Sequence, residues 1–206
     1  MILAGMFAAL LFLGLILGDW LYFVRLTPDA SRYGCGIAKS QSTIRAVSLP
    51  SFRKRLDDNG GALILPHGIA RMYPDLDQIA IRPQYHLFSM SFRTAWPVKG
   101  LIHLSTGEES TNMLCVKRIP WSSALITMLW FLLVGAGTAS FLVMYALQGG
   151  LDSFTGVLMG AGILGIGLLV FAFGLVTVVI SYRLENSRLE RVYGELRAEM
   201  EKTAAT

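Results

Sequence analysis

Three long apolar blocks restrict the fold of this chain more than any other sequence feature. They run over Ile2–Val24, Ser122–Leu147 and Gly156–Tyr182. A membrane-crossing helix needs about 20 apolar residues, because it rises about 1.5 Å per residue through about 30 Å of hydrocarbon. All three blocks are long enough, and the second and third contain no charged residue. The pattern predicts an α-helical integral membrane protein with three transmembrane helices.

The first block has two interpretations, a secretory signal peptide or a retained anchor. A signal peptide has a basic start, a short apolar stretch and a small-residue cleavage site. Here no Lys or Arg precedes Arg25, and the block ends in Asp19-Trp20-Leu21-Tyr22-Phe23. We therefore expect a retained transmembrane helix over residues 1–24.

The positions of Lys and Arg predict the orientation. Of the 18 basic residues, thirteen lie between the first and second apolar blocks and five follow the third, while the N-terminus and the Gln148–Thr155 turn have none. Basic segments stay on the cytoplasmic side. We expect a multi-pass protein of the plasma (cell inner) membrane, with the N-terminus outside and the C-terminus cytoplasmic. Aromatic residues mark the expected cytoplasmic ends of the spans: Trp20, Tyr22, Trp121 and Tyr182.

Residues 25–120 change to short runs in which apolar and polar residues partly alternate. Turns rich in Pro, Gly and Asp separate these runs, as in an antiparallel meander. A short helix is expected at residues 51–60, between Ser51 and Gly60. The prediction is a small β-rich α+β domain on the cytoplasmic side. The expected strands are 62–65, 68–73, 79–81, 86–93, 99–105 and 111–119.

The third apolar helix is expected to continue through residues 183–206 as a cytoplasmic amphipathic helix, since no Pro interrupts it. Its five basic and five acidic residues cancel, which argues against nucleic-acid binding. An isolated apolar stripe adds little stability unless something covers it. The stripe therefore predicts docking onto a partner, with a solvated helix as the alternative. It consists of Leu189, Val192, Tyr193, Leu196 and Met200.

Small residues line faces of the apolar blocks. Such faces let membrane helices approach closely. Residues 121–182 are expected to form a transmembrane hairpin, and the glycines exceed what one hairpin contact needs, so a second helix or a flat lipid-soluble ligand is the further hypothesis. Gly162 and Gly165 broaden the groove. The helix-packing candidates are Gly14, Gly18, Gly156, Gly160, Gly167 and Gly174.

Two charged features remain. Asp19 is the one ionisable residue inside a predicted span, and intramembrane carboxylates are functional candidates. Its structural alternative is a hydrogen bond to a neighbouring helix or access to water. Arg53, Lys54 and Arg55 are three consecutive basic residues that could meet anionic lipid headgroups, or could serve only as a solvated basic face.

No catalytic, metal or cofactor motif stands out. Cys35 and Cys115 lie far apart, and the histidines His67, His86 and His103 are scattered. None of them falls in a metal-ligand or nucleophile pattern. The Gly34–Ser40 segment lacks the spacing of a phosphate-binding loop.

Three functional hypotheses follow. The leading one is a non-catalytic accessory or assembly subunit of a larger membrane complex, whose partners are other membrane subunits and lipids. The second is a membrane-surface module that binds or senses lipids. The third is a membrane enzyme or redox component that shares its site with partner subunits.

Overall fold

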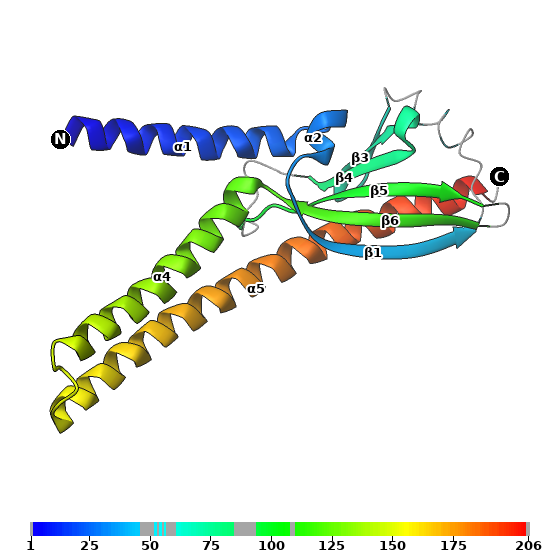
Figure 1. Cartoon of the computed structure of the whole chain (residues 1–206). Coiled ribbons are helices and arrows are strands. Elements are labelled where there is room, and N and C mark those ends of the chain that lie inside the picture. The colour runs from blue at the N-terminus through cyan, green and yellow to red at the C-terminus, as the bar shows by residue number, and fades with distance from the viewer. Residues whose placement is uncertain are drawn as a thin grey trace. The chain divides into compact units, whose positions relative to one another are not determined.

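The computed structural model describes residues 2–45, 52, 54, 56, 61–84, 94–107 and 110–204. The chain divides into two compact units. The sheet unit is Met1–Ser122 with Arg183–Thr206, and the hairpin unit is Ser123–Tyr182. Three helices are long and apolar enough to cross a membrane, as predicted: α1 (Ile2–Val24), α4 (Trp121–Leu147) and α5 (Phe154–Ala204) (Figure 1).

The described residues of the sheet unit form one antiparallel sheet of six strands in the order β1-β6-β5-β4-β3-β2. From β2 to β6 each strand pairs with the next one in the chain, so the predicted meander is confirmed there. The strand expected at 86–93 lies outside the described residues. The strands are β1 (Cys35–Arg45), β2 (Ala62–Ile64), β3 (Gly68–Tyr73), β4 (Gln78–Pro83), β5 (Lys99–Thr106) and β6 (Ser110–Ile119).

Strand β1 was not predicted. It pairs with β6 from Cys35 opposite Ile119 to Arg45 opposite Ser110, with a bulge between Gly36 and Ala38. Its residues are mostly small and polar, so it carries little of the alternation that identifies a strand. Pairing with the long β6 decides its structure.

The C-terminal part of α5 covers one face of the sheet. Leu189, Val192, Leu196 and Met200 are each at most 1% exposed and lie in the main hydrophobic core. The stripe therefore packs on the protein's own sheet, which corrects the expectation that a partner covers it. The sheet-side residues of this core are Ile44, Leu65, Ala70, Met72, Ile79, Ile81, Val98, Ile102, Leu104, Met113 and Cys115.

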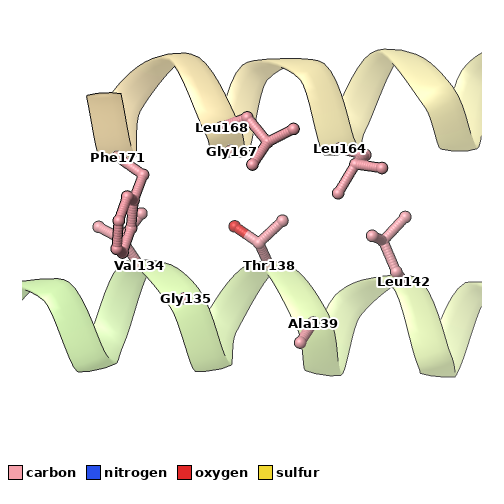
Figure 2. Close-up of a pocket in the computed structure, with 9 residues that line it drawn as sticks. All are labelled: Val134, Gly135, Thr138, Ala139, Leu142, Leu164, Gly167, Leu168 and Phe171. Atoms are coloured by element: carbon pink, nitrogen blue, oxygen red, sulfur yellow. The ribbon is translucent and has the colours of Figure 1, made fainter. Parts of the chain in front are cut away.

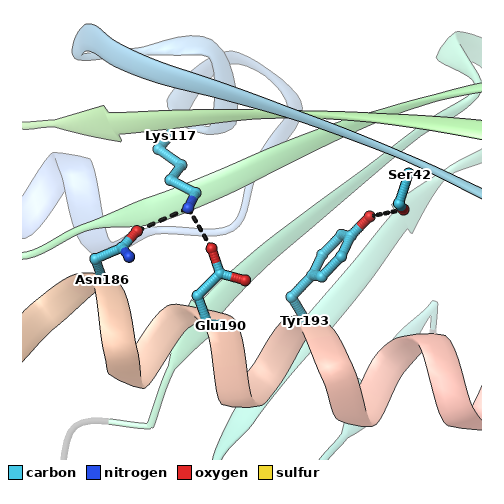
Figure 3. A network of polar contacts seen from close by, with 5 residues as sticks. All are labelled: Ser42, Lys117, Asn186, Glu190 and Tyr193. Atoms are coloured by element: carbon cyan, nitrogen blue, oxygen red, sulfur yellow. Dashed lines mark hydrogen bonds and ion pairs between the residues drawn. The ribbon is translucent and has the colours of Figure 1, made fainter.

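Polar contacts accompany this packing (Figure 3). The Lys117 ammonium on β6 donates to Asn186 Oδ1 at 2.7 Å and to the Glu190 carboxylate, both on α5. The hydroxyls of Tyr193 and Ser42 share a hydrogen bond. Tyr193 is thus a partly buried member of the stripe whose polar end is bonded to β1.

Gly68 explains how closely α5 approaches β3. A Cβ at this position would lie 2.5 Å from the Arg82 carbonyl oxygen and 2.5 Å from a methyl group of Val192. Glycine at the first residue of β3 therefore lets the α5 stripe reach the sheet. The predicted short helix is described only at Phe52, Lys54 and Leu56, which are helical, and the two apolar side chains are buried in the same core.

The second face of the sheet carries a smaller apolar cluster of Tyr73, Ala80 and Leu101, with Leu26 packed against it. The short helix α2 (Pro28–Arg32) begins after Thr27, whose hydroxyl accepts from an α2 amide. Ser31 of α2 is hydrogen-bonded to the Tyr73 hydroxyl at 2.8 Å. A 3₁₀ turn, η1 (Pro74–Leu76), joins β3 to β4.

In the hairpin unit, the glycine face of α5 is occupied by α4. A Cβ at Gly167 would lie 2.5 Å from the Thr138 side chain, and one at Gly174 would lie 2.1 Å from the Trp130 ring. Phe131 and Phe171 stack edge-to-face at 4.8 Å. Close helix approach therefore depends on these glycines, in agreement with the expected hairpin.

Candidate functional site

Hydrogen-bonded polar side chains of the sheet unit gather around the C-terminal end of α1. Asp19 accepts hydrogen bonds from the Tyr33 hydroxyl at 2.5 Å, the Ser122 amide at 3.0 Å and the Ser122 hydroxyl at 2.5 Å. Since α4 begins at Trp121, the Ser122 amide is among those that have no acceptor within the helix. A carboxylate at this position caps the helix and suits its dipole.

Tyr33 supplies the other side of this contact. Its hydrogen bond to Asp19, with some burial, raises the pKa of the Tyr33 phenol to about 12. The ring packs edge-to-face against Tyr22, with centroids 4.9 Å apart. Asp19 is thus a carboxylate whose two oxygens are hydrogen-bonded, with one partner on the segment after α2 and the other at the start of α4.

Gly34 allows the chain to turn beside α1. Its φ of +110° is a conformation that L side chains rarely adopt, and a Cβ would lie 2.6 Å from the Ile119 carbonyl oxygen and 2.8 Å from the Phe23 ring. The Gly34 carbonyl accepts a hydrogen bond from Arg118 at 2.9 Å. Any side chain at this position would displace β6 or the end of α1.

Lys99, the first residue of β5, is 2% exposed. Its ammonium donates to the Phe23 carbonyl at 3.2 Å and to the Ala30 carbonyl, and it lies 4.1 Å from the centroid of the Phe23 ring. The ammonium therefore satisfies carbonyls at the ends of both α1 and α2. A cation at a helix C-terminus is favourable. Burial, helped by Arg118 and opposed by Asp19, lowers the pKa of Lys99 to about 7.

Further basic groups adjoin Lys99 on the second face of the sheet. Arg118 lies directly opposite Lys99 in the β5–β6 register. The Arg32 Nε donates to Gln78 Oε1 at 3.3 Å, and Gln78 Nε2 lies 3.3 Å from His103 Nδ1. Burial together with Arg118 and Arg32 lowers the pKa of His103. We call Arg32, Lys99, His103 and Arg118 the basic cluster.

The remaining predicted positions lie elsewhere. Arg53 and Arg55 are outside the described residues, as is His86, and Lys54 is exposed. His67 contacts the Glu195 carboxylate through its ring Nδ1. Among the described residues, no group of three or more His, Cys, Asp or Glu side chains is placed to hold a metal ion.

Neither cysteine pairs with another. Cys35 is partly exposed and Cys115 is buried. Burial raises the pKa of the Cys115 thiol to about 11, so it holds its proton at neutral pH. A thiol in this form is a poor nucleophile.

An apolar groove of about 310 Å³ lies between α4 and α5 in the hairpin unit (Figure 2). Thr138 supplies the hydroxyl in its lining, and Gly135 and Ala139 leave space on the α4 side. The other lining residues are Val134, Leu142, Leu164, Gly167, Leu168 and Phe171. Apolar helix surfaces of this kind are suited to acyl chains or to another helix.

The sequence had indicated only Asp19 in the junction around α1. Lys99 was missed because it follows the alternation of its strand, on the same face as Leu101 and His103, and a lysine in such a pattern is usually solvated. Tyr33 and Ser122 give no signal in the sequence, since their partner lies far along the chain. Comparisons with protein-family models, curated proteins and solved structures find no match to this chain.

Proposed function

We propose that this chain is a non-catalytic accessory or assembly subunit of a larger membrane protein complex. The observation that carries the proposal is the use of the ionisable groups around α1. Both oxygens of Asp19 accept hydrogen bonds from Tyr33 and Ser122, and the Lys99 ammonium binds two backbone carbonyls. These hydrogen bonds hold the ends of α1, α2 and α4 in position.

We further propose that the sheet unit lies on the cytoplasmic side of the plasma (cell inner) membrane, with the N-terminus and the α4–α5 turn outside. The distribution of Lys and Arg supports this orientation. On this proposal, the sheet unit is an anchored cytoplasmic module and the apolar helices provide the contacts with other subunits.

Fewer surfaces remain open to such partners than the sequence indicated. The α5 stripe is buried in the chain's own core, and Gly167 and Gly174 face α4. Around Gly162 and Gly165 of α5 and Gly135 of α4, nothing described lies within 4 Å of an added Cβ. We propose that partner helices pack against these smooth positions, because small residues favour close helix contact.

The test is gentle extraction of the tagged full-length chain from its native membrane, followed by native mass measurement. We expect an assembly heavier than the 22.6 kDa chain, with other polypeptides in fixed stoichiometry. A monodisperse lone chain at every detergent concentration would refute the proposal. The alternatives, a lipid-sensing module that acts through Arg53, Lys54 and Arg55 and an enzyme with a shared site, remain predictions.

A further inference from the structure

The basic cluster brings several positively charged side chains together on the second face of the sheet. Arg118 and Lys99 are direct cross-strand neighbours, and like charges in that relation are destabilising. Asp19 is the acidic group whose charge acts favourably on Lys99, and its oxygens are already hydrogen-bonded to Tyr33 and Ser122. An anion bound beside Arg118 would relieve the repulsion between the two cations.

The donors of the cluster have defined directions. The Arg32 Nε donates to Gln78 Oε1, which makes that atom the amide oxygen and Nε2 the donor toward His103. His103 Nδ1 must then accept, so a neutral His103 ring carries its proton on Nε2. This leaves the Nε2–H of His103 as a donor for a ligand.

Arg118 has an N–H donor that is not used among the described residues. One of its terminal nitrogens bonds the Gly34 carbonyl at 2.9 Å. Its Nε is buried and has no hydrogen-bond partner among the described residues. A buried donor without an acceptor is costly, and a charged guanidinium matches the oxygens of a phosphate. Arg32, Arg118 and His103 thus offer donors of the kind that bind a phosphate group.

The location of the cluster indicates the source of the phosphate. The Lys99 ammonium contacts the carbonyl of Phe23, in the last turn of the apolar helix α1. If α1 crosses the bilayer, its end lies at the headgroup layer, which extends about 5–7 Å beyond the hydrocarbon on each side. The neighbouring Tyr22 and exposed Leu21 provide apolar surface for acyl chains.

We propose that the basic cluster binds the headgroup phosphate of an anionic phospholipid, with Arg32 and Arg118 as its main contacts. This site is distinct from the three consecutive basic residues Arg53, Lys54 and Arg55 that the sequence indicated. A lipid-binding site also goes beyond the proposed role as a subunit. It would make the junction of α1, α2 and the sheet sensitive to the lipid composition of the membrane.

The test titrates the full-length protein in dodecyl maltoside and follows bound-lipid adducts by native mass spectrometry. The probes are dioctanoyl phosphatidylglycerol, dioctanoyl phosphatidylcholine and inorganic phosphate. Arg32→Gln and Arg118→Gln should each weaken phosphatidylglycerol binding about fivefold, a loss expected for one basic contact. The matched control is Arg191→Gln, which removes the same charge from an exposed position on α5 and should bind as the wild type does.

Each outcome bears on the proposal. Preference for phosphatidylglycerol that is lost in Arg32→Gln and kept in Arg191→Gln supports it. Equal binding of phosphatidylcholine, or wild-type binding by Arg32→Gln, overturns it. Tighter binding of inorganic phosphate than of the lipid also overturns it, because the site would then serve a soluble anion. Should Arg118→Gln fail to fold through loss of its Gly34 contact, Arg32→Gln decides the result.

Discussion

The backbone amide of Ser122 donates a hydrogen bond to the carboxylate of Asp19 at 3.0 Å, although 103 residues separate them. This contact joins the last turns of α1 to the first turn of α4 within the sheet unit. Lys99 acts in the opposite sense, because its ammonium binds the carbonyl of Phe23 at the C-terminus of α1. Each helix end therefore meets the charge that its dipole favours.

The Asp19–Ser122 contact predicts a coupling between these two residues. Asp19→Ala removes a helix cap, and caps contribute about 0.5–2 kcal/mol to the free energy of unfolding. Ser122→Ala removes the hydroxyl bond and keeps the amide bond. In a double-mutant cycle of thermal unfolding in detergent, we expect the second change to cost much less once the first is present. Strictly additive losses would mean that the contact does not form.

Lys99 predicts a pH dependence of stability. Its pKa is about 7 in the folded protein, against 10.5 as the ordinary value. Between pH 7 and 9 the unfolded chain keeps this proton and the folded protein releases it, so the unfolded state binds more protons and stability rises with pH. Over two pH units the gain is about 2 kcal/mol.

The measurement is the thermal midpoint of the wild type and of Lys99→Met at pH 7, 8 and 9. Lys99→Met should abolish the rise. Toward pH 9 the Cys115 thiol opposes this rise, because its pKa is about 11 in the folded protein against 9.0 as the ordinary value, but it does so equally in the wild type and in Lys99→Met. Parallel curves for the two proteins would show that Lys99 does not titrate in this range.

Because the stripe is buried in the protein's own core, a mutation in it should destabilise the fold and should not simply release a partner. Leu196 is fully buried, and Leu→Ala at such a position costs about 2–5 kcal/mol. Leu196→Ala should lower the thermal midpoint and increase protease cleavage within the sheet unit. Leu184→Ala, at a position 42% exposed on the same helix, is the matched control and should change little. Equal effects of the two changes would contradict the packing of α5 on the sheet.

The stripe also illustrates what sequence can and cannot predict. Helical spacing identified Leu189, Val192 and Leu196 as one apolar face, but periodicity does not state which surface covers that face. The alternation of β3 to β6 was sufficient to predict those strands, whereas the polar β1 depends on pairing with β6. Contacts such as Asp19 with Ser122 arise only when distant segments meet, and no local pattern encodes them.

The orientation predicts opposite accessibility for two exposed aspartates. In a Cys35→Ser background, Asp152→Cys in the α4–α5 turn should react with an impermeant maleimide in intact cells. Asp75→Cys in η1 should react only after the membrane is permeabilised. Cys115 can remain, because it is buried and its thiol has a raised pKa. Labelling of Asp75→Cys in intact cells would reverse the proposed topology.

Two glycines of α5 test two different contacts, the packing of α5 on α4 and the proposed contact with a partner helix. A Cβ at Gly167 would lie 2.5 Å from Thr138 Cγ2 and 2.6 Å from its hydroxyl oxygen, whereas nothing described lies within 4 Å of a Cβ at Gly165. Gly167→Ala should therefore destabilise the isolated chain by about 1–3 kcal/mol, the usual cost of overpacking. Thr138→Ala removes the two closest atoms, so Gly167→Ala should cost less in that background.

Gly165→Leu provides the contrast. Leucine is favourable in a membrane span, so the isolated chain should keep its insertion and its thermal midpoint. A partner helix packed against this face cannot accept the added volume without moving away. We therefore expect Gly165→Leu to reduce recovery of partners at matched expression while the chain itself remains stable. Undiminished recovery would exclude this face of α5 as the contact, and a loss of stability equal to that of Gly167→Ala would contradict the hairpin packing.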